Sequence, residues 1–195
     1  MKIKSAKFLR SDDSTSFFND GIPEIAFVGR SNVGKSSLLN NLCQKKDLAR
    51  TSKTPGRTRL INYFSINDSF RFVDLPGYGF HLAGKQLEKK WSIILERYLL
   101  ENNDLKLVIL LLDSRHNPSE LDKVMINFLY SNQIPFIVIA TKCDKLPKSK
   151  IKNNISALAK EIKIPVGNIF AHSSENSFGR EQILDYIENF LTKEN

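Results

Sequence analysis

The stretch Gly29-Arg-Ser-Asn-Val-Gly-Lys-Ser36 decides the fold of this 195-residue chain. An apolar run at residues 25–28 precedes it, and residues 36–42 follow with apolar side chains at helical spacing. A strand, a glycine-containing loop and a helix in this order form a phosphate-binding loop, because backbone N–H groups approach the phosphate oxygens and the helix N-terminus adds partial positive charge. We therefore predict that Lys35 reaches the β- and γ-phosphates and that the Ser36 hydroxyl binds Mg²⁺. The predicted phosphate-binding residues are Gly29, Arg30, Ser31, Asn32, Val33, Gly34, Lys35 and Ser36.

Apolar strand-like and helix-like patterns alternate along the rest of the chain. The strands are expected at residues 25–28, 60–66, 70–75, 107–112, 136–140 and 168–171, with a hairpin turn at 67–69. Helical spacing recurs between them, and the helix near residue 125 is expected to bury Leu121, Val124, Met125, Phe128 and Leu129. Alternation of this kind predicts an α/β fold, with a mostly parallel six-stranded sheet, one antiparallel edge strand and helices on both faces.

The composition is that of a single globular domain, with 41% apolar and 26% charged residues. We expect residues 1–21 to be a basic lead-in of uncertain structure and residues 22–195 to form one domain. No apolar stretch approaches the roughly 20 residues of a membrane span, and residues 1–5 lack a signal peptide's apolar core. Cys43 and Cys143 suggest neither a disulfide framework nor a metal site. These features favour a reducing cytoplasm, away from membranes, and we expect a monomer.

The net charge of +8 is concentrated in two segments. Residues 45–59 hold six lysines and arginines against Asp47, and residues 142–163 hold seven lysines against Asp144 and Glu161. Such patches favour a polyanionic partner such as RNA, because phosphate contacts add along a basic surface. Solvated lysine-rich helix faces explain the same charge, so composition leaves both explanations open.

Three loops that follow predicted strands carry further nucleotide-binding signals. In Asp74-Leu75-Pro76-Gly77, Asp74 would hold Mg²⁺ through water and the Gly77 N–H would contact the γ-phosphate. In Thr141-Lys142-Cys143-Asp144, the Asp144 carboxylate can accept from guanine N1–H and the exocyclic amine, whereas adenine offers an acceptor at that position. Lys142 would lie along the base and brace the phosphate loop. The turn His172-Ser173-Ser174 would contact the guanine O6 edge.

Residues 51–62 form the fourth candidate loop, because their Pro-Gly and hydroxyl content is typical of a mobile segment. A threonine here should complete the Mg²⁺ shell when the γ-phosphate is present. We choose Thr58, directly before a predicted strand, over Thr54, which is also plausible. The expected contacts come from Gly56, Arg57, Thr58, Arg59 and Leu60.

These motifs resemble those of the EngB (YihA/YsxC) family of bacterial GTPases, in the TrmE–Era–EngA branch of P-loop GTPases. The most discriminating pieces are Ser52-Lys-Thr-Pro-Gly-Arg-Thr58 and the Gly-Tyr-Gly79 that follows Pro76. The resemblance covers essentially the whole chain. It implies a Ras-like fold, Mg²⁺-dependent GTP binding, a role in assembly of the large ribosomal subunit, and a requirement in cell division and septation.

A GTPase of this kind would hydrolyse GTP slowly, with Lys35, Thr58 and Gly77 as the catalytic candidates. Tyr78 stands where many GTPases carry a water-orienting Gln, so turnover should depend on a partner. Asn32 could help hold K⁺ beside the phosphates, or it could simply shape the loop. Two rival functions remain open, an ATP-dependent P-loop kinase or ATPase and a non-catalytic RNA- or ribosome-binding module that keeps GTP as a structural ligand. The Thr141–Asp144 motif argues against the ATP-dependent class.

Overall fold

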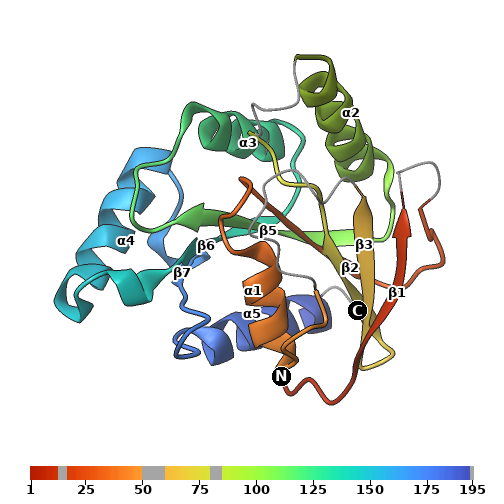
Figure 1. The fold of residues 1–195 in the computed structure, drawn as a ribbon, viewed down its shortest axis with the longest axis horizontal. Coiled ribbons are helices and arrows are strands. Elements are labelled where there is room, and N and C mark those ends of the chain that lie inside the picture. The colour runs from red at the N-terminus through yellow and green to blue at the C-terminus, as the bar shows by residue number, and fades with distance from the viewer. Residues whose placement is uncertain (13–16, 50–59, 80–84, 194–195) are drawn as a thin grey trace.

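A mixed seven-stranded sheet forms the centre of the molecule in this computed structural model (Figure 1). The structure describes residues 1–12, 17–49, 60–79 and 85–193, with the backbone alone for residues 85–92. The strand order across the sheet is β1-β3-β4-β2-β5-β6-β7. The strands are β1 (Ala6–Asp12), β2 (Glu24–Gly29), β3 (Ile61–Ile66), β4 (Phe70–Asp74), β5 (Leu105–Asp113), β6 (Phe136–Thr141) and β7 (Ile169–Ala171).

The predicted fold class is confirmed, but the strand count and the edge differ from expectation. The lead-in contributes β1, which pairs antiparallel with β3, and β3 pairs antiparallel with β4. The antiparallel strand therefore lies second from the edge, and β1 at the edge runs in the same direction as β4. The hairpin turn between β3 and β4 is confirmed: Asn67 and Asp68 have φ of 51° and 52°, as a tight two-residue turn requires.

Helices cover both faces of the sheet, as predicted. They are α1 (Lys35–Cys43), α2 (Lys85–Glu101), α3 (Glu120–Ser131), α4 (Lys148–Ile162) and α5 (Arg180–Lys193). Alternate residues of β2 point to the two faces of the sheet. Ala26 and Val28 pack on the face covered by α2, α3 and α4, whereas Ile25 and Phe27 pack on the face covered by α1 and α5. None of the helices in the described part of the chain is both long and apolar enough to span a membrane.

Helix α3 is rotated relative to the expected stripe. Ser119 and Asp122 form a capping box at its N-terminus, which turns Asp122 inward. Ile126 and Leu129 then share the buried side with Asp122, one and two turns further along. The prediction that Val124 is buried was wrong, because its side chain points to the opposite side and is 62% exposed.

A partly buried ionic network ties the lead-in to the sheet at the end opposite the phosphate loop. Arg71 of β4 donates to Asp20 and to Glu24, and its guanidinium lies 3.9 Å from the centre of the Phe18 ring. Glu24 is fully buried and also accepts hydrogen bonds from Tyr98 of α2 at 2.8 Å. Residues 17–24 and the C-terminal part of α2 are therefore held to one another and to β4.

Candidate nucleotide site

The predicted loops lie together where the parallel strands end, along the side of the sheet formed by their carboxyl ends (Figure 1). Strand β2 leads into the phosphate loop, β4 ends at Asp74, β6 ends at Thr141 and β7 ends at Ala171. Strand β5 lies between β2 and β6 and ends at Asp113. Ligands of open α/β sheets bind at this edge. Every predicted loop within the described residues thus reaches the same location.

The phosphate loop presents the N-terminus of α1. Gly34 caps this helix with a φ of 113°, a conformation that residues with a Cβ rarely adopt. Among the described residues, no side chain caps the helix and its first turn contains no acidic residue. The N-terminal N–H groups and their partial positive charge therefore suit an anion.

Lys35 and Asp74 face each other beside this loop. The Lys35 Nζ lies 3.7 Å from Asp74 Oδ1, and both side chains are nearly buried. This is an ion pair without a hydrogen bond, and Asp74 Oδ1 has no hydrogen-bond partner within the described residues. Burial raises the pKa of Asp74, and the charge of Lys35 opposes that shift. An unpaired buried carboxylate oxygen next to a phosphate loop fits a hydrated cation, and Ser36 follows Lys35 at the same helix start.

Gly77 lies directly against the phosphate loop. A Cβ on Gly77 would stand 3.1 Å from the Ser31 backbone nitrogen, so the approach leaves little space for a side chain. The Ser31 N–H donates to the Tyr78 carbonyl at 3.2 Å, and the Tyr78 N–H donates to the Gly29 carbonyl at 3.3 Å. Both residues between Asp74 and Gly77 are buried. The Asp74–Gly77 motif is therefore joined to the phosphate loop through backbone contacts.

The Tyr78 side chain reaches α3. Its hydroxyl donates to Asp122 Oδ1 at 2.7 Å, while Asp122 Oδ2 accepts from the Ser119 N–H and hydroxyl. Burial and the Asp122 carboxylate raise the pKa of Tyr78 well above its ordinary value, so the hydroxyl remains a donor. The residue that stands in place of a water-orienting Gln is thus engaged with the capping box of a neighbouring helix.

The Thr141–Asp144 loop contacts the phosphate loop through two side chains. The Thr141 hydroxyl donates to the Val33 carbonyl at 2.8 Å. The Lys142 ammonium donates to the Asn32 carbonyl and to Asp113 Oδ2, each at 2.9 Å. Thr141 and Lys142 therefore both hold the Thr141–Asp144 loop against the phosphate loop.

Asp113 is a site residue that the sequence prediction missed. Despite its partial burial, hydrogen bonds from Arg115 and Lys142 hold the pKa of Asp113 well below its usual value. The charged carboxylate fixes Lys142 in its position over the phosphate loop. The sequence could have indicated Asp113 by its position at the carboxyl end of β5, because that strand end lies between the phosphate loop after β2 and the Thr141–Asp144 loop after β6.

The turn after β7 meets the Thr141–Asp144 loop. The Ser173 hydroxyl donates to Asp144 Oδ1 at 2.7 Å and keeps the pKa of Asp144 below its usual value. Lys145 lies 3.0 Å from Asp144 Oδ2. The Cys143 thiol points the other way into the core, where burial raises its pKa. Asp144 is thus the ionised, oriented carboxylate of this loop.

The His172 ring is buried away from the loop surface. Its Nε2 lies 2.9 Å from Asn41 Oδ1 of α1, and burial lowers the pKa of His172 to about 4. Its backbone carbonyl accepts the Cys143 N–H at 3.1 Å, and the Ser174 carbonyl accepts from the Asn41 amide at 3.4 Å. The His172 side chain is therefore held in the interior against α1, and its backbone N–H also donates inside the protein, to the Ala140 carbonyl at 2.8 Å.

Two predicted groups of residues remain without structural support. Gly56, Arg57, Thr58 and Arg59 lie outside the described residues, as does Thr54. Leu60 is described, and its side chain is 40% exposed next to the start of β3. The Asn32 side chain forms no hydrogen bond with any described residue, although its backbone has a φ of 63°.

The fold, with a phosphate loop between β2 and α1 and the further loops at the same sheet edge, is that of a P-loop GTPase. A family profile described as "50S ribosome-binding GTPase" matches residues 24–142. The probable GTP-binding protein EngB of Fusobacterium nucleatum is 45% identical over 98% of this chain and 99% of its own. That of Pelotomaculum thermopropionicum is 46% identical, with 98% of each chain covered. The chain belongs to the EngB family of GTP-binding proteins and is a GTPase.

Solved structures with low sequence identity share the fold. A crystal structure of a probable GTP-binding protein EngB matches with a TM-score of 0.74 at 24% identity, covering 87% of this chain and 99% of that one. Era, in complex with MgGDPNP and nucleotides of 16S ribosomal RNA, matches with a TM-score of 0.69 at 23% identity, covering 86% of this chain and 56% of that one.

Proposed function

We propose that this GTPase is a nucleotide-dependent switch that acts in assembly of the large ribosomal subunit. Support for the base-binding part comes foremost from Lys142, whose ammonium joins the base-reading loop to the phosphate loop at Asn32. A nucleotide bound across these loops presents its base to Asp144, which Ser173 orients. Guanine donates N1–H and an amine to this carboxylate, whereas adenine presents an acceptor where guanine has its N1–H.

Mg²⁺ is part of this proposal. The Ser36 hydroxyl, Asp74 through water and, in the GTP state, Thr58 are the groups that would hold it. The unpaired Asp74 Oδ1 supports this assignment. When bound, the ion would neutralise phosphate charge, and Lys35 and the Gly77 N–H would contact the terminal phosphates.

Hydrolysis by the chain alone is slow in this proposal. The Tyr78 hydroxyl is engaged with Asp122, and a phenol bound in this way does not align an attacking water. A partner or a K⁺ ion beside Asn32 would then supply the missing transition-state stabilisation. Loops 45–60 and 76–90 would change with the nucleotide and alter the surface offered to that partner.

The large ribosomal subunit is the proposed partner. The description of the matching family profile and the net charge of +8 support it, because ribosomal RNA is a polyanion. We place the protein in the cytoplasm as a monomer, where ribosomal subunits assemble. A requirement in cell division and septation remains an expectation of the family resemblance.

Sedimentation with purified large subunits tests the proposal. We expect more protein to co-sediment with a non-hydrolysable GTP analogue than with GDP or without nucleotide. The Asp144→Asn variant should lose this response to the GTP analogue and regain it with the corresponding xanthosine analogue. Failure to co-sediment in every nucleotide state would reject the ribosomal partner, and an unaltered response of Asp144→Asn would reject the base assignment.

A further inference from the structure

Helix α4 carries a concentration of positive charge that no other described helix matches. Its exposed lysines are Lys148, Lys150, Lys152 and Lys160, followed by Lys163 at the C-cap, and Glu161 is its one acidic residue. None of these five lysines forms an ion pair with a described residue. By contrast, Lys123 on α3 pairs with Glu120 at 3.0 Å. The positive charge of α4 is therefore available to an external partner.

This charge opposes the stability of the helix that carries it. Lys148 and Lys150 lie in the first turn, where the helix dipole favours negative charge, and that turn contains no acidic residue. Lys148 and Lys152 stand one turn apart, a spacing at which like charges repel. A helix selected for stability alone would place glutamates among them. Residues that oppose the stability of their own helix are expected where the surface binds a partner.

The arrangement of the lysines suits an extended polyanion. Ile155, Leu158, Ala159 and Ile162 fix one side of α4 against the sheet. Lys148, Lys152 and Lys160 are each exposed and are spread over about 18 Å of helix axis at 1.5 Å per residue. Exposed Ser149, Asn153 and Ser156 lie among them and can donate to phosphate and sugar oxygens.

The chemistry of α4 favours RNA over a membrane or an apolar protein surface. The apolar side of the helix is already packed in the core, so no free apolar side remains to enter a bilayer. The exposed side within the helix has no aromatic residue and no arginine, which protein interfaces and base stacking favour. Lysine ammonium groups with small polar side chains indicate contact with phosphates, without reading of bases.

We propose that the exposed side of α4 is an RNA-backbone-binding surface whose affinity does not depend on the bound nucleotide. This inference rests on the proposed ribosomal function and specifies the surface involved. Helix α4 follows the base-reading loop through the 3-10 turn Cys143–Lys145. It packs next to β7, which is at the opposite end of the strand order from β1 and β3 (Figure 1). It contains neither of the loops expected to change with the nucleotide. It would hold RNA while those loops report the nucleotide state.

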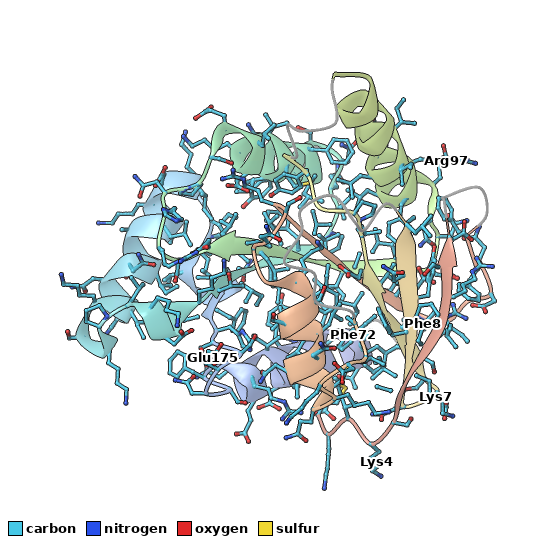
Figure 2. The ribbon with its side chains drawn as sticks, viewed as in Figure 1. Lys4, Lys7, Phe8, Phe72, Arg97 and Glu175 are labelled. Atoms are coloured by element: carbon cyan, nitrogen blue, oxygen red, sulfur yellow. The ribbon has the colours of Figure 1, made fainter. Side chains whose placement is uncertain are left out.

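The test compares two triple variants of equal charge in the full chain. One carries Lys148→Gln, Lys152→Gln and Lys160→Gln. The control carries Lys2→Gln, Lys4→Gln and Lys7→Gln, which remove the same charge near β1; Lys4 and Lys7 lie on the side of the molecule away from α4 (Figure 2). The probes are a 30-base-pair RNA duplex of arbitrary sequence and vesicles with phosphatidylserine, each with GDP and with a GTP analogue.

We expect the α4 variant to bind the duplex about 10- to 100-fold more weakly at 0.1 M salt, equally with both nucleotides. The slope of log affinity against log salt should decrease by about three, one for each lost phosphate contact. The control should retain the wild-type affinity, and an α4 variant with three Lys→Arg substitutions should also retain it. GTP affinity should be the same in all variants.

Three results would overturn the proposal: unaltered duplex affinity of the α4 variant, an equal loss in the control, or a loss confined to vesicles. A loss restricted to one nucleotide state would overturn the independence from nucleotide. The duplex measurement does not use ribosomal subunits. Its outcome is therefore distinguishable from a failure of the sedimentation experiment, which concerns the proposed ribosomal partner.

Discussion

Replacing Tyr78 with Phe should destabilise the protein without slowing GTP hydrolysis. The substitution removes one hydroxyl, which donates at 2.7 Å to Asp122 Oδ1. Asp122 is 5% exposed and its other oxygen is occupied by Ser119, so Oδ1 would remain as a buried charged acceptor without a partner in the described chain. Hydrogen bonds to charged groups contribute about 1.5–3 kcal/mol. Because Tyr78 is itself partly exposed and water can replace the hydroxyl, we expect a loss of about 1–2 kcal/mol.

Thermal unfolding measures this loss. For a domain of 150–250 residues, 1 kcal/mol shifts the melting temperature by about 2–4 °C, so the expected decrease is about 2–8 °C. Tyr130→Phe is the matched control, since that ring is 49% exposed and its hydroxyl has no hydrogen bond with a described residue. It should change stability by less than about 0.5 kcal/mol.

Single-turnover hydrolysis completes the experiment. A hydroxyl bound to Asp122 does not act on the nucleotide, so the rate of the Tyr78→Phe variant should stay within about twofold of wild type. A tenfold slower rate with an unaltered melting temperature would instead place the hydroxyl at the reacting phosphate.

Four further predictions concern the nucleotide site. Asp144→Asn should weaken GTP by several kcal/mol and favour xanthosine triphosphate; unaltered GTP affinity in a titration would contradict the assignment. Thr58→Ala should weaken Mg²⁺-dependent binding of GTP more than of GDP, and equal effects on both in the same titration would favour Thr54 or no threonine ligand. The folded pKa of His172, about 4, lies below its unfolded value, so the unfolded state binds the proton first. Stability should be complete above pH 6.5 and decrease by about 3 kcal/mol as the pH falls towards 4. His172→Gln should remove this acid dependence in denaturant titrations, whereas the exposed His116→Gln should keep it. Hydrolysis should be faster in K⁺ than in Na⁺ at equal ionic strength, and Asn32→Ala should abolish the difference; equal rates for wild type would leave Asn32 a structural residue.

The fold was predictable where short-range patterns and topology agree. The loop from Gly29 to Ser36 has a strand before it and a helix after it, so its structure follows from neighbouring residues. Strand β1 was not predictable in the same way. Its pairing with β3 is irregular between Phe8 and Arg10, and both Phe8 and Leu9 are exposed, so its sequence does not alternate as a regular strand does. Helix α3 differed from prediction because a polar residue, Asp122, lies on its buried side, where it accepts from Ser119 and Tyr78, and an apolar pattern does not include such a residue.

In the candidate site, too, residues in local motifs were predictable and their long-range contacts were not. Lys35, Lys142 and Asp144 belong to motifs whose strand-end positions bring them to one sheet edge. The contacts that orient such residues come from side chains far away in sequence: Ser173 holds Asp144 across 29 positions, and Asp122 holds Tyr78 across 44. No local pattern encodes such a pair, because each partner also has an ordinary role in a turn or helix cap. Motifs therefore identify the groups that can meet a nucleotide, and only the packing of α3 and β7 determines their orientation and whether Tyr78 faces the phosphates at all.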